Sequence, residues 1–414
     1  MAQCVFVAIV SATERLVNKK VGAAMRKSEV ALKPTVVSLF SGCGGIDLGF
    51  EAAGFQTKAV LDIALYAGET LRKNFPEAKV IAPPLYSGDI TDPTAVNQLP
   101  ARGVDVLVGG PPCQSFSIAA AQRFLKSDKK FKRTGFRDRK RGVLMHYFLK
   151  VLAEMRPRVF VIENVPGLQD LDGGKELLEI LRFCRGLGYR IAEPAVLQAA
   201  DYGVPQYRQR LIVIGVRGQR AQEATFPSAT HSDTKDLFTL LPSHVTVAEA
   251  LAYLPVKARN HVPREHNASS VARYRRLRFG QREKLGRVDR LDPRRPSKTV
   301  IAGGMNGGGR SHLHPFLART LTVRECARLQ TFPDAFEFMG GMSRQFTQVG
   351  NAVPPLLAEL LARSIGRQFF GLSYADAPTF RTNRRSRSVE VCVADLLRQA
   401  QDEAEYLYDD LVAS

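Results

Sequence analysis

The sequence predicts a doubly wound, Rossmann-like α/β domain joined to a second, smaller domain. Three observations carry this prediction. From residue 34 onward, short β-branched apolar runs alternate with segments of helical periodicity, which is typical of a parallel sheet with crossover helices. A glycine-rich turn directly follows the first of these runs. After residue 218 the alternation ends and Arg, His, Pro and Ser become frequent, which indicates a separate basic domain.

Each element follows from a local pattern. Strands are expected where β-branched and other apolar residues cluster between turn residues, at 35–40, 58–62, 104–108, 159–165 and 210–216, with a further unit that ends at 88–90. Helices are expected where apolar residues recur every three or four positions, at 47–53, 144–155, 324–330 and 356–365, and an acidic amphipathic helix is expected in the C-terminal tail.

These patterns divide the chain into four parts. They are an N-terminal extension (1–33), an α/β domain (34–218, completed by 345–370), a second domain (219–344) and a C-terminal extension (371–414). The sequence contains no internal repeat. The organisation is therefore that of a two-domain protein with an extension at each end.

The composition favours some classes of protein and disfavours others. The 59 basic and 40 acidic residues give a net charge of +19, and so large a surplus favours a polyanionic partner. No apolar run approaches the roughly 20 residues that span a bilayer, so a membrane protein is not expected. The six cysteines are scattered, which favours the reducing cytoplasm over a disulfide framework or a zinc site. His312 and His314 lack nearby cysteine or carboxylate partners, so no metal site is expected.

Cys113 lies in the segment GGPPCQSFS (109–117), directly after the predicted strand at 104–108. Gly109 and Gly110 end the strand, and the two prolines that follow fix their φ angles, which gives a stiff loop at a strand end. Open α/β sheets bind their ligands at such loops. An isolated cysteine is more often a small buried apolar residue, but the rigid polar surroundings here favour a reactive thiol.

The glycine-rich turn SGCGG departs from the dinucleotide-binding fingerprint GxGxxG. Gly42 and Gly44 match the first two glycines, but Asp47 occupies the third position, so a nicotinamide cofactor is disfavoured. Asp62 ends the second strand and Asp89 ends the third, where they can accept hydrogen bonds from ribose hydroxyls and an adenine amino group. Together they indicate a nucleoside-bearing cofactor without a pyrophosphate.

Two further polar groups lie at predicted strand ends. They are Glu163 and the QYRQR segment (206–210), which carries Arg208 and Arg210. A carboxylic acid at this place can donate a proton, guanidinium groups can hold a carbonyl oxygen, and a nearby cation lowers the pKa of a thiol. The residues alone leave open the alternative that Glu163 and Arg210 form an ordinary ion pair.

A series of sequence blocks resembles the DNA (cytosine-5)-methyltransferase family of the bacterial type. In chain order the blocks are FSGCGGIDLGFEAAGF from 40, Asp62, GDI from 88, GGPPCQSFS from 109, RDRKRG from 137, ENVPGL from 163, QYRQRLIVIG from 206, RECARLQTFPD from 324 and QVGNAVPP from 348. They extend from about residue 34 to residue 365. The combination of PPCQ, ENV, QxRxR and GNAVPP is highly specific to the family.

The resemblance implies an S-adenosylmethionine-dependent methyltransferase fold and a set of roles. Cys113 would add to carbon 6 of a cytosine, and Glu163 would protonate or hydrogen-bond ring nitrogen 3. Arg210, with Arg208 behind it, would hold the carbonyl oxygen and orient Glu163. The target base would have to leave the duplex to react. The implied cofactor residues are Phe40, Gly42, Gly44, Gly45, Asp62, Ile63, Asp89, Ile90, Pro111, Asn351 and Val353.

The resemblance also implies partners. Residues 34–218 would form the catalytic and cofactor-binding domain, and residues 219–344 the target-recognition domain, in which Arg, Asn and Gln are plausible base readers. Double-stranded DNA is the implied substrate, bound by a monomer in the cytoplasm, at the nucleoid. Restriction–modification is the commonest setting of the family, and it adds a cognate endonuclease encoded nearby as a candidate partner.

Three other functions fit parts of the sequence. A tRNA cytosine-5 methyltransferase would share the fold, but the Cys-Phe-Thr element usual in that branch is missing. A DNA-binding relative without catalysis would not need Cys113, Glu163 and Arg210, all of which are present. A nicotinamide-dependent oxidoreductase is disfavoured by Asp47.

Overall fold

The computed structural model describes residues 33–111, 142–218, 223–234, 240–285, 288–302, 312–382 and 387–413, with residues 142–143 and 404–413 described by their backbone alone. Contacts between Cα atoms divide the chain into residues 1–34 and 35–414, and the second unit is the one described below. Cys113 lies outside the described residues. Within the described ranges, no helix combines the length and the apolar character needed to cross a membrane.

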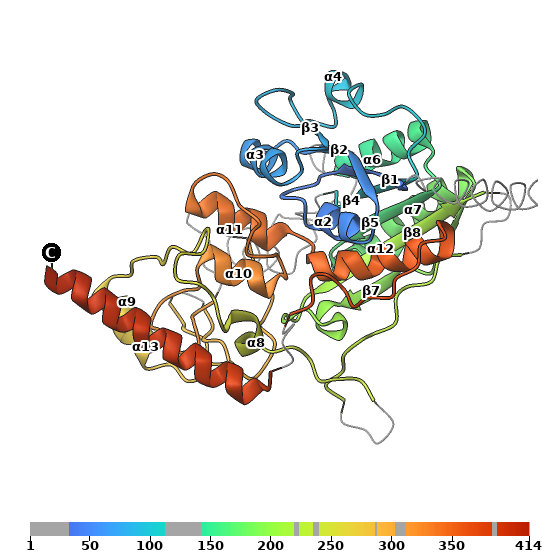
Figure 1. Cartoon of the computed structure of the whole chain (residues 1–414). Helices are drawn as coiled ribbons and strands as arrows, with labels where there is room; N and C mark the ends of the chain where they lie inside the picture. The colour runs from blue at the N-terminus through green and yellow to red at the C-terminus, as the bar shows by residue number, and fades with distance from the viewer. Residues whose placement is uncertain are drawn as a thin grey trace, which may run out of the picture. The chain divides into compact units, whose positions relative to one another are not determined.

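A mixed, eight-stranded sheet organises the N-terminal half of this unit (Figure 1). Its strand order is β3-β2-β1-β4-β5-β8-β6, and β7 also pairs with β8. The first five strands are parallel, whereas β8 runs antiparallel to β5, so β8 begins at the edge where the parallel strands end. The strands are β1 (Thr35–Leu39), β2 (Gln56–Leu61), β3 (Lys79–Ile81), β4 (Val106–Gly109), β5 (Val159–Asn164), β6 (Tyr189–Ile191), β7 (Ala195–Gln198) and β8 (Gln209–Arg217).

Helices cover both faces of the sheet: α6 (Gly142–Met155) and α7 (Lys175–Gly186) on one face, α2 (Gly45–Ala52) and α12 (Pro355–Phe369) on the other. Successive side chains of a strand point to opposite faces. Val37 and Leu107 accordingly belong to the core with α6 and α7, while Val36 and Val106 belong to the core with α2 and α12. Because both faces are covered, β1 and β4 are almost continuously apolar.

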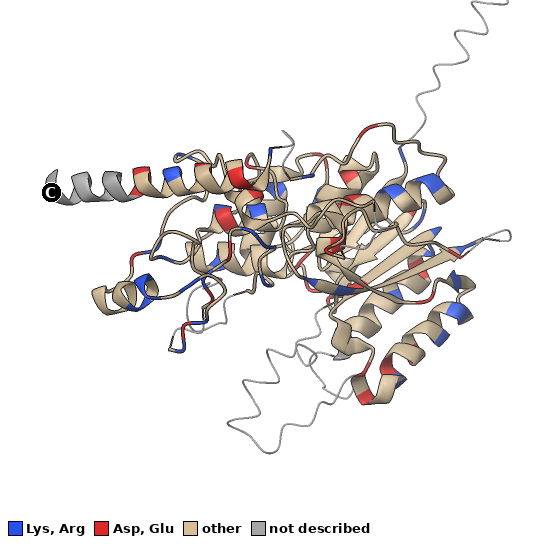
Figure 2. Cartoon of the chain, turned by 90° about the horizontal axis from the view of Figure 1, so that it is seen from below, with Lys and Arg blue, Asp and Glu red and all other residues tan. Residues whose placement is uncertain are grey.

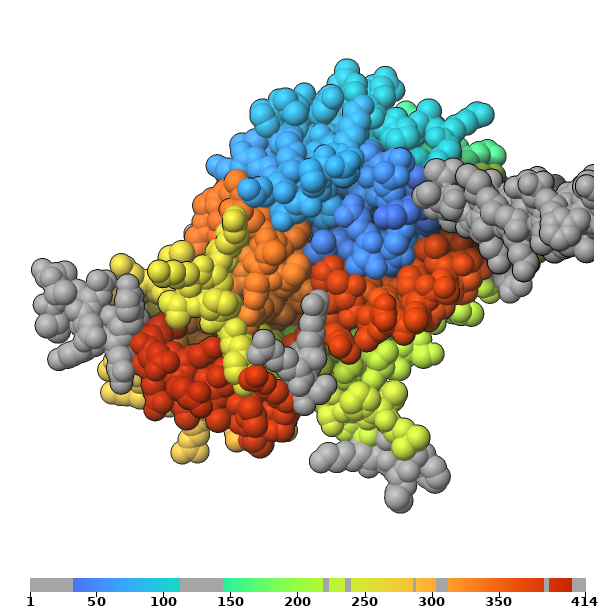
Figure 3. All heavy atoms as spheres, in the orientation of Figure 1, coloured from blue at the N-terminus to red at the C-terminus, as the bar shows by residue number. Residues whose placement is uncertain are grey.

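The chain returns to the first βα unit near its far end. In Figure 3 the surface of α12, in orange-red, lies directly against the blue surface of the first strands and α2. A Cβ on Gly49 of α2 would lie 2.4 Å from the Cβ of Ala358, so only glycine allows this close approach. The helix α12 thereby completes the sheet's second face.

The C-terminal half of the unit consists mainly of short helices joined by loops. A further apolar core links this half to the sheet, because Leu71 and Phe75 pack with Leu329, Phe336 and Leu396. The remaining α-helices are α3 (Leu65–Asn74), α4 (Pro93–Val96), α8 (Val247–Leu251), α9 (Ala268–Arg275), α10 (Val323–Leu329), α11 (Met342–Asn351) and α13 (Val389–Ala413), and the 3-10 helices are η2 (Pro166–Leu168), η3 (Leu171–Gly174) and η4 (Ala199–Tyr202).

The helix α13, the acidic amphipathic helix expected in the tail, is held by a buried ion cluster. The guanidinium of Arg319 donates to both carboxylate oxygens of Glu325, each at 2.9 Å, and to both oxygens of Glu403 at 2.7 and 2.8 Å. Glu403 lies on α13 and Glu325 on α10. The C-terminal extension is therefore fixed to the helices of the C-terminal half.

Most of the elements expected from the sequence are confirmed, but the third strand is not. That strand ends at Ile81, not at 88–90, and Pro83 and Pro84 follow, which have no N–H to donate to a sheet. Asp89 therefore lies in a loop, where its Oδ1 accepts hydrogen bonds from the N–H and the hydroxyl of Thr91, at 2.8 and 2.9 Å.

Candidate active site

Glu163 and Arg210 form an ion pair at the carboxyl end of the parallel strands. Glu163 is the fifth residue of β5, Arg210 is the second residue of β8, and these strands are antiparallel neighbours. The Nε of Arg210 lies 2.7 Å from Oε1 of Glu163, and the two side chains are only 14% and 13% exposed. The ion pair that the sequence left open as an alternative is thus present, at the strand ends where a ligand would bind.

The loop that leads to Cys113 leaves the sheet against this pair. A Cβ on Gly110 would lie 2.7 Å from Oε2 of Glu163, so the glycine lets the backbone pass close to the carboxylate. One residue further, the carbonyl oxygen of Pro111 accepts a hydrogen bond from Nδ2 of Asn164, at 3.3 Å. Two successive residues of the loop are therefore held at the end of β5.

Arg208 has different partners from those expected. Its side chain is 1% exposed and donates to three backbone carbonyl oxygens, those of Val300 at 3.2 Å, Gly350 at 3.0 Å and Ala352 at 2.8 Å. Burial lowers the pKa of Arg208 well below its usual value, the charge of Arg210 lowers it further, and Glu163 opposes both. Among the described residues, every hydrogen bond of the Arg208 guanidinium goes to a main-chain carbonyl oxygen, so this side chain acts on the positions of other segments.

The glycine-rich turn after β1 is a run of left-handed backbone conformations. Phe40, Gly42 and Gly44 have φ angles of 56°, 55° and 89°, which bring successive backbone groups to one side of the turn. The N–H of Gly42 donates to Oδ2 of Asp62 at 2.8 Å, and the N–H of Ala64 donates to Oδ1 at the same distance. Burial raises the pKa of Asp62 above its usual range, and these two N–H groups lower it. Asp62 thus fixes the turn that follows β1 to the end of β2.

Gly45 brings the far end of the chain to the same turn. A Cβ at this position would lie 2.3 Å from the carbonyl oxygen of Val353, so a larger residue would displace the backbone there. Val353 is buried, whereas Asn351, the last residue of α11, is exposed. The structure therefore joins the FSGCGG and GNAVPP segments, although more than 300 residues separate them in the chain.

The segment that carries Asp89 also lies close to Asp62, but Asp89 lies in a loop and not at the end of a strand as expected. Gly88 has a φ of 64°, and a Cβ on it would lie 2.0 Å from the carbonyl oxygen of Asp62. Ile90 is buried in the core and has no access to a ligand in this conformation, whereas Ile63 is 62% exposed. The backbone next to Asp89 thus passes directly beside Asp62.

Asp47 occupies an unusual environment that sequence reasoning missed. It faces the sheet from the first turn of α2, its exposure is 0%, and neither carboxylate oxygen has a partner in good hydrogen-bond geometry among the described residues. Burial raises the pKa of Asp47 to about 7, and the nearby Ser38 hydroxyl lowers it. The only sequence signal was an aspartate where a dinucleotide fingerprint has glycine.

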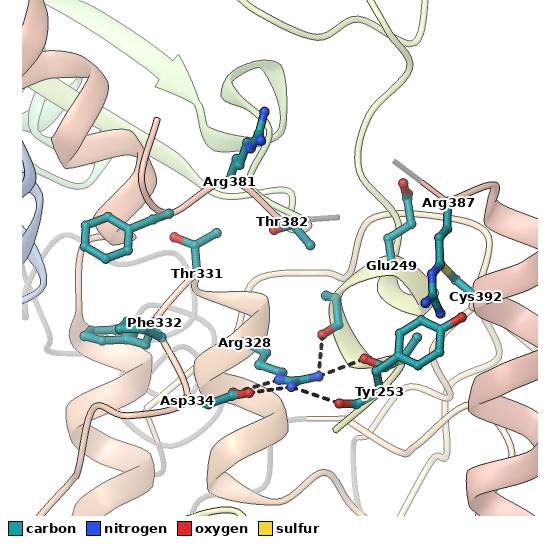
Figure 4. Close-up of a pocket in the computed structure, with 14 residues that line it drawn as sticks. Glu249, Tyr253, Arg328, Thr331, Phe332, Asp334, Arg381, Thr382, Arg387 and Cys392 are labelled. Atoms are coloured by element: carbon teal, nitrogen blue, oxygen red, sulfur yellow. Dashed lines mark hydrogen bonds and ion pairs between the residues drawn. The ribbon is translucent and has the colours of Figure 1, made fainter. Parts of the chain in front are cut away.

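A cavity of about 450 Å³ lies elsewhere, between the C-terminal tail and helices α8 and α10 (Figure 4). Tyr253, Phe332 and Arg381 are among its lining residues, and the guanidinium of Arg328 is held there by Asp334. None of the site residues expected from the sequence lines it. In the described part of the chain, no cluster of three or more His, Cys, Asp or Glu side chains is arranged to hold a metal ion.

The chain is similar in sequence to known methyltransferases. The family model for C-5 cytosine-specific DNA methylases matches residues 34–367. The type II methyltransferases M.NgoFVII of Neisseria gonorrhoeae and M.Eco47II of Escherichia coli are 35% and 36% identical, over 80% of this chain and 86% and 78% of those proteins.

Solved structures of methyltransferases are also similar to this chain. A prophage protein of E. coli, described as a DNA modification methyltransferase, superposes with a TM-score of 0.62 at 26% identity over 82% of this chain and all of that one. Dnmt2 of S. pombe shares the fold, with a TM-score of 0.55 at 18% identity over 83% of this chain and all of that one. The chain belongs to the C-5 cytosine-specific DNA methylase family.

Proposed function

We propose that this protein is a DNA (cytosine-5)-methyltransferase that modifies a cytosine within a specific sequence of double-stranded DNA. The observation that carries the proposal is the ion pair of Glu163 and Arg210, because Gly110 and Pro111 hold the lead-in to Cys113 against it. A nucleophile, a carboxyl group and a guanidinium are the three groups that addition to a cytosine ring requires.

In the proposed mechanism these residues divide the work. The Cys113 thiolate adds to carbon 6 of the flipped-out base while Glu163 hydrogen-bonds or protonates ring nitrogen 3. Arg210 holds the ring's carbonyl oxygen and keeps the Glu163 carboxyl oriented. The addition makes carbon 5 nucleophilic, and loss of its proton later expels the thiol. Arg208 is a positioning residue in this scheme, because its guanidinium binds main-chain carbonyl groups.

S-adenosylmethionine is the proposed methyl donor and supplies an electrophilic methyl group when bound. The residues fit such a nucleoside-bearing ligand, since the half-buried carboxylate of Asp62 accepts one N–H on each oxygen and keeps lone pairs for ribose hydroxyls. Asp89 and exposed Ile63 lie beside it for the adenine. The other proposed contacts are with Phe40, Gly42, Gly44, Gly45, Pro111, Asn351 and Val353.

Target recognition is proposed for residues 219–344, and the catalytic and cofactor domain for 34–218 with 345–370. Lys and Arg positions, blue in the ribbon of Figure 2, recur over both halves of the unit, and the net charge of +19 supports sequence-independent contact with the DNA backbone. The named relatives are type II methyltransferases, which supports a cognate endonuclease as partner. We expect a monomer on the DNA, acting in the cytoplasm at the nucleoid.

The experiment that tests the proposal is bisulfite sequencing of genomic DNA from cells that express the protein. Protection of one cytosine within a recurring short sequence is expected, and the Cys113→Ser variant serves as the inactive control. Unprotected DNA, together with methyl transfer to purified tRNA, would replace the proposal with an RNA-modifying function.

A further inference from the structure

Residues 297–302 of the C-terminal half run alongside the segment that leads into β8. Gln206 and Ser297 form a parallel bridge. The N–H of Tyr207 donates to the carbonyl oxygen of Ser297 at 2.8 Å, and the N–H of Ser297 donates to that of Pro205 at 3.0 Å. The Thr299 hydroxyl adds a hydrogen bond to the carbonyl oxygen of Tyr207, at 2.7 Å. Hydrogen bonds therefore join residues 205–207 to residues 297–299.

Buried side chains strengthen this junction. Gln206 is 0% exposed, and its Oε1 accepts the N–H of Val300 at 2.9 Å. Its Nε2 donates to the carbonyl oxygen of Leu329 and to Oε1 of Gln330, at 3.2 and 3.0 Å. One glutamine thus binds both the 297–302 segment and the end of α10.

Arg208, two residues after Gln206, also binds the 297–302 segment. Its guanidinium joins the carbonyl oxygen of Val300 to those of Gly350 and Ala352. Gly350 also packs against the backbone of Ala302, where a Cβ would lie 2.2 Å from the nitrogen. A shift of residues 300–302 must therefore break charge-assisted hydrogen bonds or carry Arg208 with it.

Arg208 directly precedes Gln209, the first residue of β8, so only one residue separates it from Arg210, which holds Glu163. We propose that Gln206 and Arg208 are positioning residues that couple the 297–302 segment to the Glu163–Arg210 pair. Contacts with the correct DNA sequence in the C-terminal half thereby set the catalytic pair in place. Discrimination between DNA sequences then appears in kcat as well as in binding. This inference rests on the proposed DNA methyltransferase function.

The test compares Arg208→Lys with a matched control, Arg363→Lys. Lysine keeps the charge but loses the planar fork that binds several carbonyl oxygens at once. Arg363 is also buried and also donates to two main-chain carbonyl oxygens, those of Asp376 and Ala377, but it lies on α12 and outside the junction. Both variants remove buried hydrogen bonds to main-chain carbonyl oxygens, and Arg363→Lys also alters an ion pair with Glu359, so the effect of a general loss of stability would appear in the control as well.

For each variant, kcat and KM are measured on the duplex identified by bisulfite sequencing and on a duplex with one base pair of that site changed. For Arg208→Lys we expect the ratio of the two kcat values to fall at least about fivefold, the lower end of typical coupling between sites, with KM for DNA changed less. Arg363→Lys should leave the ratio unchanged. Equal ratios in the wild type and both variants would overturn the inference.

If Arg208→Lys does not fold, the same measurement is made on Thr299→Val. This substitution conserves volume and removes the hydrogen bond to Tyr207 from the other side of the junction. A reduced kcat ratio is again expected, and an unchanged ratio would overturn the coupling. Failure of the proposed function is distinguishable, because the wild-type protein would then methylate neither duplex.

Discussion

The Nε of Arg210 lies 2.7 Å from Oε1 of Glu163, across the antiparallel junction of β5 and β8. The strand order produces this contact, because β8 starts where β5 ends. The pair is only slightly exposed, so its attraction is less screened than that of a surface ion pair. Four predictions follow from the site around it.

Glu163→Gln should abolish most of the methyl transfer while leaving the affinities for DNA and cofactor nearly unchanged. Glutamine keeps the shape of the side chain but cannot deliver a proton, and a positioned acid contributes roughly 10²–10⁴-fold to a rate. Single-turnover assays with saturating DNA would measure the loss. Glu193→Gln, at an exposed carboxylate, is the control. A rate within twofold of the wild type would remove Glu163 from the chemistry.

Gly110→Ala should reduce activity more than stability. The added Cβ meets the tip of the Glu163 side chain at 2.7 Å, and this tip can move, so we expect to lose only about 1 kcal/mol of unfolding free energy. Displacing the catalytic carboxyl by about 1 Å should nevertheless lower kcat by up to roughly 10²-fold. Gly186→Ala is the control, because no atom lies within 4 Å of its added Cβ. Equal activities of the two variants would contradict the geometry.

Asp62→Ala should weaken the binding of S-adenosylmethionine by about 1–3 kcal/mol, because ribose hydroxyls and the Gly42 N–H would lose their acceptor. Titration calorimetry measures this change. Asp105→Ala removes a comparable set of hydrogen bonds, those to the N–H and hydroxyl of Thr35, at the amino ends of the strands. If the two variants bind the cofactor equally well, Asp62 does not contact it.

Asp47 should make the unfolding free energy depend on pH. Its folded-state pKa of about 7 is above the ordinary value of 3.8, so the unfolded chain loses the proton first. Stability from this group is complete below about pH 4 and falls as pH rises to about 7, with a slope of up to about 1.4 kcal/mol per pH unit. Asp47→Asn should remove that slope, as measured by urea unfolding of the cofactor-free protein. An identical slope in both proteins would show that Asp47 is ionised without cost.

The strand ends that carry Asp62, Glu163 and Arg210 could be predicted from the sequence, because apolar runs bounded by turn residues are local signals. The partners of Arg208 could not be predicted, since they are carbonyl oxygens of residues 92 to 144 positions away. Because every residue has a carbonyl group, no sequence pattern indicates which of them accepts such a hydrogen bond.

Close approaches between segments could not be predicted from the sequence either. The sequence does not indicate that another segment passes within van der Waals distance of Gly110, Gly88 and Gly350, where each glycine is needed. Asp89 is expected at a strand end because an apolar run precedes it, but Pro83 and Pro84 follow directly after the strand, which ends at Ile81. Its place beside Asp62 depends on the backbone of Gly88 instead.

The central claim is that Cys113 attacks a cytosine held by Glu163 and Arg210. The most direct measurement uses duplex DNA in which the target cytosine is 5-fluorocytosine, since fluorine cannot leave as a proton does and the covalent adduct persists. Peptide mass spectrometry after incubation with S-adenosylmethionine should locate the adduct at residue 113. An adduct at any other cysteine, or methylation of normal DNA without an adduct on the fluorinated duplex, would contradict the claim.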